Sequence, residues 1–375
     1  MYLRKSLRVW SSVISSMKSC VSLFTVVTVI LLLSGCGISA NPSDSAKTTM
    51  SAYQKILARK SVSILVVGDS IAEGSGASDY KYAWPSILEE YIETKYKTKV
   101  NTTNISMGGE SSLAGFVRLL ELDPKPYYDL VMVCFGENDP EENFEIYYEA
   151  LIRRILKQYP GCSIICIQEH SQRDYTAKMK TIKEIADHYG IPVVDTIQPF
   201  RDHPEGYDAL VKDGTHPNDK GYEVFAEAVE SVFDSEVDAK SLPIEAGTEP
   251  RNAEVSFFDN ATWIPVKKFK KKSLTYTADI PSDIAGNGKK NFLSEGTGVM
   301  MVADLTDYPE RNYLTVINNG ELIAKRDADW PYSFPQHHIP IVSDNVIIRE
   351  GTLTIEFENE EQAESFSGCG FILGE

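Results

Sequence analysis

The residues that could do chemistry begin with Ser70, which follows the apolar run at residues 64–67 through Gly68 and Asp69. A run of four aliphatic residues bounded by glycine is typical of a buried parallel strand. Gly68 is expected to let the backbone turn, so that Ser70 lies at the carboxyl end of that strand, where ligands bind in open α/β sheets. Because a serine hydroxyl is a weak nucleophile until a base takes its proton, Ser70 needs a histidine from elsewhere in the chain.

The segment Asp213-Gly-Thr-His216, just before the last predicted helix, offers that histidine. His216 would take the proton from Ser70 and return it to a leaving alcohol, while Asp213 accepts a hydrogen bond from the other ring nitrogen. Two more polar blocks follow predicted strands: Asn104-Ile-Ser-Met-Gly-Gly109 and Gly136-Glu-Asn-Asp139. Four such blocks at strand ends or a helix start favour a catalytic site.

Together, and in this order, the four blocks resemble the SGNH (GDSL-type) hydrolases over residues 61–235. The resemblance implies a serine hydrolase that acts on ester bonds, with Ser70, His216 and Asp213 as catalytic residues. It also implies an oxyanion hole made by the backbone N–H groups of Ser70 and Gly109 and by the side-chain amide of Asn138.

Each residue also has a plainer interpretation. Asp-Ser after a strand often caps a helix, Asn138 could satisfy backbone groups in a tight turn, and His216 could be a surface residue. Among the remaining polar residues, Asp69 is expected to orient the loop of Ser70, and Asp139 to be a solvated loop residue. His170, after the fourth predicted strand, is expected either to line the substrate cleft or to be solvated.

Alternating strands and helices must position these residues. The strands are predicted at residues 64–67, 99–105, 129–135, 163–168 and 192–196. The amphipathic helices are predicted at residues 84–92, 112–122, 142–159, 175–189 and 218–233. Such alternation implies right-handed crossovers and a parallel sheet covered on both faces. Residues 59–236 are therefore predicted to form a doubly wound, flavodoxin-like α/β hydrolase domain with a five-stranded parallel sheet.

The pattern changes after residues 237–252, a linker rich in Asp, Glu, Ser, Pro and Gly. The turn dipeptide Asn319-Gly320 between two strand-like runs predicts a two-residue hairpin. Residues 352–358 alternate between polar and apolar side chains, as a half-buried strand does. Since no convincing amphipathic helix occurs, residues 253–375 are predicted to form an antiparallel β-sandwich accessory domain.

The N-terminus has a basic flank and then an apolar run at residues 21–33, which ends in Leu33-Ser-Gly-Cys36. Residues 1–35 are therefore predicted to be a secretory signal, and its ending resembles the bacterial lipoprotein signal, in which the cysteine becomes lipidated. The alternative is an uncleaved anchor, although a span needs about 20 apolar residues. Residues 36–58 are predicted to be a flexible spacer, with a short helix near residues 50–59. The protein is thus expected outside the cytoplasm, lipid-anchored through Cys36 to a bacterial cell membrane.

Without residues 1–35 the chain has 33 basic and 54 acidic side chains, a net charge of −21. This excess of carboxylates excludes the class of nucleic-acid-binding proteins that present a basic face. The remaining cysteines, three of them in strand-like runs, are expected to be buried hydrophobes. No Cys/His spacing is typical of a zinc site, and the sequence implies no metal or organic cofactor.

These observations predict an exported serine esterase that cleaves short acyl groups, chiefly O-acetyl, from carbohydrate. Its location, the added β domain and the lack of a long apolar lid segment favour a sugar substrate. Three alternatives stay open: an O-acetyltransferase acting on a cell-surface glycan, a lipase or thioesterase for long acyl chains, and a non-catalytic glycan-binding lipoprotein.

Overall fold

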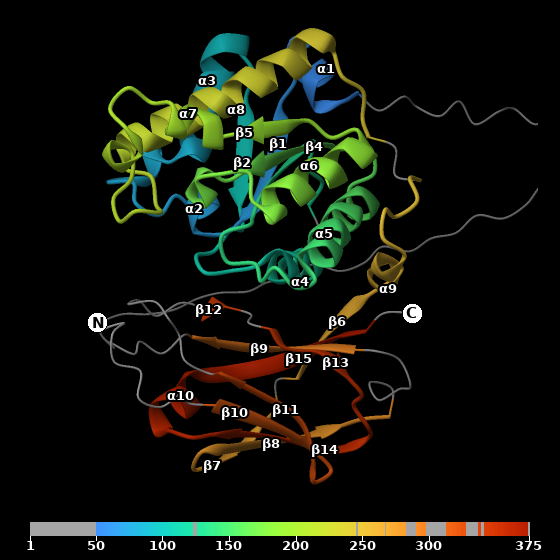
Figure 1. The fold of residues 1–375 in the computed structure, drawn as a ribbon. Coiled ribbons are helices and arrows are strands. Elements are labelled where there is room, and N and C mark those ends of the chain that lie inside the picture. Colours follow the sequence, from blue (N-terminus) through green and yellow to red (C-terminus); the bar gives the residue numbers. More distant parts are fainter. Residues whose placement is uncertain are drawn as a thin grey trace, which may run out of the picture. The chain divides into compact units, whose positions relative to one another are not determined.

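The computed structural model describes residues 50–122, 126–244, 247–266, 268–282, 290–297, 313–327, 337–338 and 341–373 (Figure 1). The predicted signal at residues 1–35, the lipidation site Cys36 and most of the predicted spacer lie outside these residues. Among the helices of the described part, none is long and apolar enough to cross a membrane.

A five-stranded parallel sheet organises the first part of the structure. Its strands are β1 (Val62–Gly68), β2 (Val100–Asn104), β3 (Leu130–Cys134), β4 (Ser163–Gln168) and β5 (Val193–Asp195). They lie in the order β2-β1-β3-β4-β5, and every neighbouring pair is parallel. The predicted doubly wound α/β sheet is therefore confirmed. The strand order reverses between β1 and β3, which is where open sheets of this kind place their ligand sites.

Helices cover both faces of this sheet (Figure 1). On one face lie α1 (Ala52–Leu57), α3 (Trp84–Tyr96) and α8 (Asp219–Ala239). On the other face lie α4 (Ser112–Glu121), α5 (Phe144–Gln158) and α6 (Ala177–Tyr189). Strand β1 shows how one sequence serves both faces: Leu65 and Val67 enter the core under α4–α6, whereas Ile64 and Val66 enter the core under α3 and α8.

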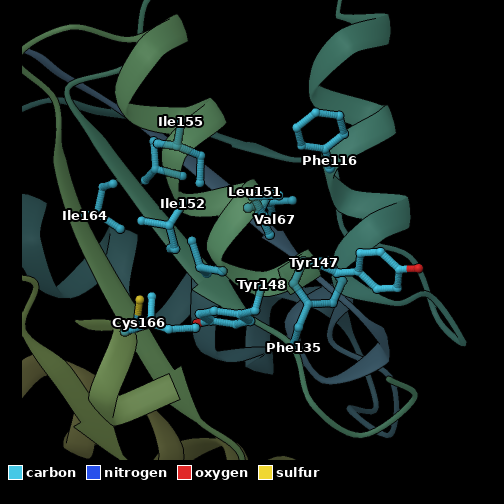
Figure 2. Packing of buried hydrophobic residues seen from close by; sticks show 14 of the residues in the cluster. Val67, Phe116, Phe135, Tyr147, Tyr148, Leu151, Ile152, Ile155, Ile164 and Cys166 are labelled. Carbon is cyan, nitrogen blue, oxygen red and sulfur yellow. The ribbon is translucent and has the colours of Figure 1, made fainter. Parts of the chain in front are cut away.

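The stripe of α5 facing the sheet shows the packing in detail (Figure 2). Leu151, Ile152 and Ile155 recur at helical spacing and are fully buried against the sheet residues Val67 and Ile164. Burial of each such side chain contributes about 1.5–3 kcal/mol. This packing therefore holds α5 against one face of the sheet, and Ser70 lies at the edge of that same sheet.

Short elements complete this part of the structure. They are α2 (Ser70–Glu73), η1 (Tyr80–Tyr82), η2 (His170–Gln172), α7 (Ile197–Arg201) and η3 (Tyr207–Ala209). The short helix expected near residues 50–59 is present as α1, where it buries Tyr53 and Ile56. The predicted spacer, residues 36–58, therefore includes at its C-terminal end a helix that belongs to the core.

Cys134, Cys162 and Cys166 are buried free thiols, as expected.

The segment after α8 packs against α5. Helix α8 continues six residues beyond its predicted end, to Ala239. The buried carboxylate of Glu149 accepts hydrogen bonds from the backbone N–H groups of Arg251 (2.5 Å) and Asn252 (3.1 Å). Arg153 then forms a two-pronged ion pair with Asp259, at 2.7 and 2.6 Å. The end of the predicted linker, residues 237–252, is thus held in place on a helix.

Two antiparallel sheets form the C-terminal part of the chain, as predicted. In one, the order is β11 (Glu321–Asp327), β10 (Tyr313–Asn318), β14 (Gly351–Phe357), β8 (Thr275–Ile280) and β7 (Lys270–Lys272). In the other it is β12 (His337–His338), β9 (Lys290–Thr297), β15 (Phe366–Leu373) and β6 (Thr262–Val266), with β13 (Ile341–Val346) also paired to β9. Buried residues of both sheets share one core, so this region is a β-sandwich.

The predicted hairpin is also present, since β10 and β11 pair across Asn319 and Gly320, both with positive φ. Short helical elements that were not predicted are η4 (Ala253–Val255), α9 (Ser256–Asp259) and α10 (Glu360–Ser365). They contain too few residues for a helical period to be visible in the sequence.

Candidate active site

Ser70 is the first residue of α2, directly after β1, as the sequence predicts. Gly68 is required here for a different reason from the expected sharp turn. A Cβ on Gly68 would lie 2.3 Å from the carbonyl oxygen of Cys134 and 2.4 Å from Cβ of Ala72, so only glycine fits between the neighbouring strand and α2. Asp69 then caps α2 by accepting a hydrogen bond from the Ile71 N–H at 3.0 Å.

His216 and Asp213 lie beside Ser70, as the sequence predicts. Nε2 of His216 lies 2.9 Å from Oγ of Ser70, and Nδ1 lies 2.7 Å from a carboxylate oxygen of Asp213. Because that carboxylate can only accept, the ring proton is on Nδ1, and Nε2 can accept the proton of the serine hydroxyl. This is the geometry that general-base activation of a serine requires.

Asp213 organises the whole turn. Its second carboxylate oxygen accepts hydrogen bonds from the N–H groups of Thr215 at 3.1 Å and His216 at 2.9 Å. Although partial burial raises the pKa of Asp213, the hydrogen bonds from His216 and Thr215 outweigh this effect and hold the pKa below its ordinary value. Asp213 is therefore a stable anion beside the imidazole.

The two loops that carry Gly109 and Asn138 lie at the same edge of the sheet. The Met107 N–H donates to the Gly68 carbonyl at 3.1 Å, and the Gly108 N–H donates to the carboxylate of Glu73 at 2.9 Å. Gly109 has a φ of 78°, a left-handed conformation that favours glycine. The Asn138 amide donates to Asp69 at 3.2 Å and to the Glu110 carbonyl at 3.4 Å.

Buried carboxylates lie beneath this edge, and the sequence analysis missed their arrangement. Burial, with the charge of Glu169 as the next cause, raises the pKa of Asp69 well above its ordinary range. Burial and the charge of Glu137 raise the pKa of Glu169 to about 8. The expectation that Asp139 is solvated is wrong: it is 4% exposed, it accepts two hydrogen bonds from Ser112, and burial raises its pKa to about 6. Glu169 follows a buried strand directly, as Asp69 does, and that position is the signal which could have identified it.

His170 is neither solvated nor part of a cleft lining, so both sequence-based expectations for it are wrong. Its side chain is completely buried, and its ring lies 4.0 Å from that of Phe200 between centroids. Nε2 of His170 lies 2.9 Å from the carbonyl oxygen of Thr215. A second histidine therefore contacts the turn that carries His216.

Sequence comparison gives the same assignment as the geometry. Residues 66–224 match the family described as GDSL-like lipase/acylhydrolase. A relative in Escherichia coli strain K12, thioesterase 1/protease 1/lysophospholipase L1, is 26% identical over 164 residues, which cover 41% of this chain and 75% of the relative.

Among solved structures, the chain is similar to a two-domain esterase active on acetylated mannans, co-crystallised with mannopentaose. The TM-score is 0.66 at 17% identity, and the likeness covers 85% of this chain and 92% of the esterase. A second structure of a two-domain esterase active on acetylated mannans gives a TM-score of 0.64 at the same identity, over 85% of this chain and 93% of that one. At such identity the likeness shows a shared two-domain fold. Residues 66–224 therefore match the GDSL-like lipase/acylhydrolase family, and the protein is an ester-hydrolysing enzyme.

Proposed function

We propose that this protein is a serine esterase that removes short acyl groups, chiefly O-acetyl, from carbohydrate. The observation that supports this proposal most directly is the chain of contacts from Ser70 through His216 to Asp213, at 2.9 and 2.7 Å. Ser70 is the nucleophile, His216 the general base and then the general acid, and Asp213 the group that fixes the imidazole tautomer.

In the first half of the reaction, Oγ of Ser70 attacks the ester carbonyl carbon while its proton passes to Nε2 of His216. The oxyanion that forms accepts hydrogen bonds from the backbone N–H groups of Ser70 and Gly109 and from the Asn138 amide. When the tetrahedral intermediate collapses, the bond to the sugar oxygen breaks and His216 gives its proton to that oxygen.

In the second half, a water molecule attacks the acyl-enzyme. His216 takes a proton from this water, the bond to Oγ of Ser70 breaks, and the proton returns to Ser70 as the carboxylic acid leaves. Ser70 is only 6% exposed. Little of the nucleophile is therefore open to solvent.

The carbohydrate part of the proposal is supported by the shared two-domain fold. The esterase active on acetylated mannans matches this chain over both the α/β sheet and the β-sandwich, since the likeness covers 85% of the chain. The sequence adds the predicted signal at residues 1–35 and the predicted lipidation site Cys36. We propose from this sequence that the enzyme lies outside the cytoplasm, anchored by lipid to a bacterial membrane, where cell-surface or environmental glycans are within reach.

The experiment uses soluble protein beginning at residue 37, mixed with acetylated manno- and xylo-oligosaccharides. Release of acetate by the wild-type protein and its loss in Ser70→Ala are the expected results. Binding of the oligosaccharide without acetate release would favour a non-catalytic glycan-binding protein. Acetyl transfer to an added glycan acceptor in preference to water would favour an acetyltransferase.

A second candidate function is hydrolysis of long-chain thioesters or lysophospholipids, which the similarity to the Escherichia coli enzyme favours. A series of p-nitrophenyl esters with increasing acyl length separates the two. We expect kcat/KM to be highest for acetyl and to fall with each added pair of methylenes. A rise with acyl length would favour the second candidate instead.

A further inference from the structure

His216 lies in a short loop, residues 211–217, and hydrogen bonds hold both the ends and the tip of this loop. Val211 and Pro217 form an isolated antiparallel bridge, and the Lys212 N–H donates to the His216 carbonyl at 2.8 Å. At the tip, the N–H groups of residues 215 and 216 point to the Asp213 carboxylate. The carbonyl groups of Gly214 and Thr215 are engaged by side chains from elsewhere in the chain.

Those side chains come from the turn after β4 and from η3. Nε2 of His170 lies 2.9 Å from the Thr215 carbonyl oxygen. A guanidinium nitrogen of Arg173 donates to the Gly214 carbonyl at 3.0 Å, and the Tyr207 hydroxyl donates to the same oxygen at 3.3 Å. Arg173 also lies over the Tyr207 ring, 4.2 Å from its centroid. Both carbonyl groups that precede His216 therefore accept hydrogen bonds. His170 and Arg173 belong to one turn, which the Arg173 N–H closes by donating to the His170 carbonyl at 2.8 Å.

His170 is held firmly enough to act as an anchor. Its backbone N–H donates to the Thr196 hydroxyl at 2.9 Å, and its ring packs against Phe200 and lies edge-on to Phe225. Because a carbonyl can only accept, the proton of the ring is on Nε2. Burial lowers the pKa of His170 to about 3, and its Nδ1 has no hydrogen-bond partner in the described part of the chain. The ring is thus a neutral donor at neutral pH.

We infer that the turn formed by residues 170–173 is a positioning device for the catalytic loop, with His170 as its main anchor and Arg173 as its second. By holding the Thr215 and Gly214 carbonyls, it keeps the imidazole of His216 at 2.9 Å from the hydroxyl of Ser70. The Asp213 side chain is 54% exposed, so packing alone holds this loop weakly. A displacement of about 1 Å at a reacting group costs on the order of 100-fold in rate. This inference rests on the proposed role of His216 as general base.

Paired substitutions at His170 test the inference. In His170→Gln, the amide nitrogen reaches the position of Nε2 and keeps the bond to Thr215, whereas in His170→Asn the amide is too short to reach it. We expect kcat to fall roughly 10- to 100-fold in His170→Asn, with KM changed less than about threefold, and to stay within about threefold of wild type in His170→Gln. His188→Asn is the matched control, because Nε2 of His188 also contacts a backbone carbonyl, that of Glu249 at 2.8 Å, on the exposed surface of α6.

A second readout does not depend on activity. The proton between Nδ1 of His216 and Asp213 should give a low-field proton NMR signal. We expect this signal in the wild-type protein and in His170→Gln, and we expect it to broaden or move in His170→Asn. If the wild-type protein shows the signal but hydrolyses no ester, the proposed function fails while the positioning inference can still be tested.

Two results would overturn the inference: wild-type kcat with an unchanged signal in a folded His170→Asn protein, or an equal loss in the Gln and Asn variants. Should His170→Asn fail to fold, Arg173→Met decides, since Arg173 is exposed. A fall in kcat of about threefold or more at unchanged KM and melting temperature supports the inference, and an unchanged kcat rejects it.

Discussion

The side-chain amide of Asn138 donates a 3.2 Å hydrogen bond to the carboxylate of Asp69, the residue that precedes Ser70. The other carboxylate oxygen of Asp69 caps α2 through the Ile71 N–H. One buried side chain therefore fixes both the helix that begins with the nucleophile and the amide proposed to meet the oxyanion. Asp69 therefore orients the amide, and the N–H of Asn138 that donates to the Glu110 carbonyl at 3.4 Å is the one that turns to the oxyanion during the reaction.

The first prediction concerns that amide. Asn138→Ala should lower kcat by about 100- to 1000-fold, because one oxyanion donor is lost, while KM for an acetyl ester changes little. Steady-state kinetics measure both. Asn101→Ala is the control, since the Asn101 amide donates to the Ser61 hydroxyl on the exposed surface. If the two variants had the same activity, Asn138 would have no part in stabilising the oxyanion.

The second prediction concerns Glu169 and pH. Its pKa is raised from 4.5 to about 8 by burial and by Glu137, so the folded state binds a proton that the unfolded chain releases above about pH 4.5. The stability that this proton provides is complete below pH 4.5 and is lost as the pH rises towards about 8. Glu169→Gln imitates the protonated acid. The melting temperature of Glu169→Gln minus that of the wild type should therefore increase between pH 5 and pH 8.5.

The exposed Glu142→Gln serves as the control for this measurement. If the difference between Glu169→Gln and the wild type changed with pH no more than the difference for this control, the assignment of a raised pKa to Glu169 would be contradicted.

The third prediction concerns the close approach at Gly68. Gly68→Ala places a Cβ 2.3 Å from a backbone oxygen of β3, which cannot move without distorting the sheet. We expect a loss of about 1–3 kcal/mol in the free energy of unfolding, measured by urea denaturation, together with reduced activity because Ser70 shifts. Gly247→Ala meets no atom within 4 Å and should unfold at the wild-type urea concentration.

The fourth prediction concerns the ion pair between α5 and α9. Arg153 and Asp259 form two hydrogen bonds, and their side chains are 17% and 30% exposed. A double-mutant cycle with Arg153→Met and Asp259→Ala should give a coupling of roughly 1–3 kcal/mol. The exposed pair Lys183–Asp187 on α6 should give only about 0.3–0.5 kcal/mol. Equal couplings would mean that the segment after α8 is not held by the Arg153 pair.

The parallel sheet and the chain segments of the site could be predicted because their signals are local. The four aliphatic residues at 64–67 form a strand buried on both faces, and polar residues that follow such strands must meet at one edge. His216 and Asp213 are three residues apart, so their contact depends on one turn. For these residues, sequence spacing already determines which groups can meet.

The features that could not be predicted depend on contacts between distant segments. The burial of His170 is set by Thr196, Phe200, Thr215 and Phe225, all at least 26 positions away, and nothing near His170 in the sequence distinguishes it from a loop residue. Likewise, the charges of Asp69 and Glu169 interact because β1 and β4 carry them to one edge. The bounds of α1 in the predicted spacer could not be fixed either, because six residues are too few for a helical period to show.

The most direct test of the account is to find where the acyl group goes. The protein is mixed with an activated acetyl ester, quenched in the acyl-enzyme phase, and examined by peptide mass spectrometry. We predict one acetyl group per chain on Ser70, none in Ser70→Ala, and much slower acetylation in His216→Gln. Acetylation of a different residue, or undiminished turnover by Ser70→Ala, would contradict the central claim that Ser70, His216 and Asp213 act together as the esterase site.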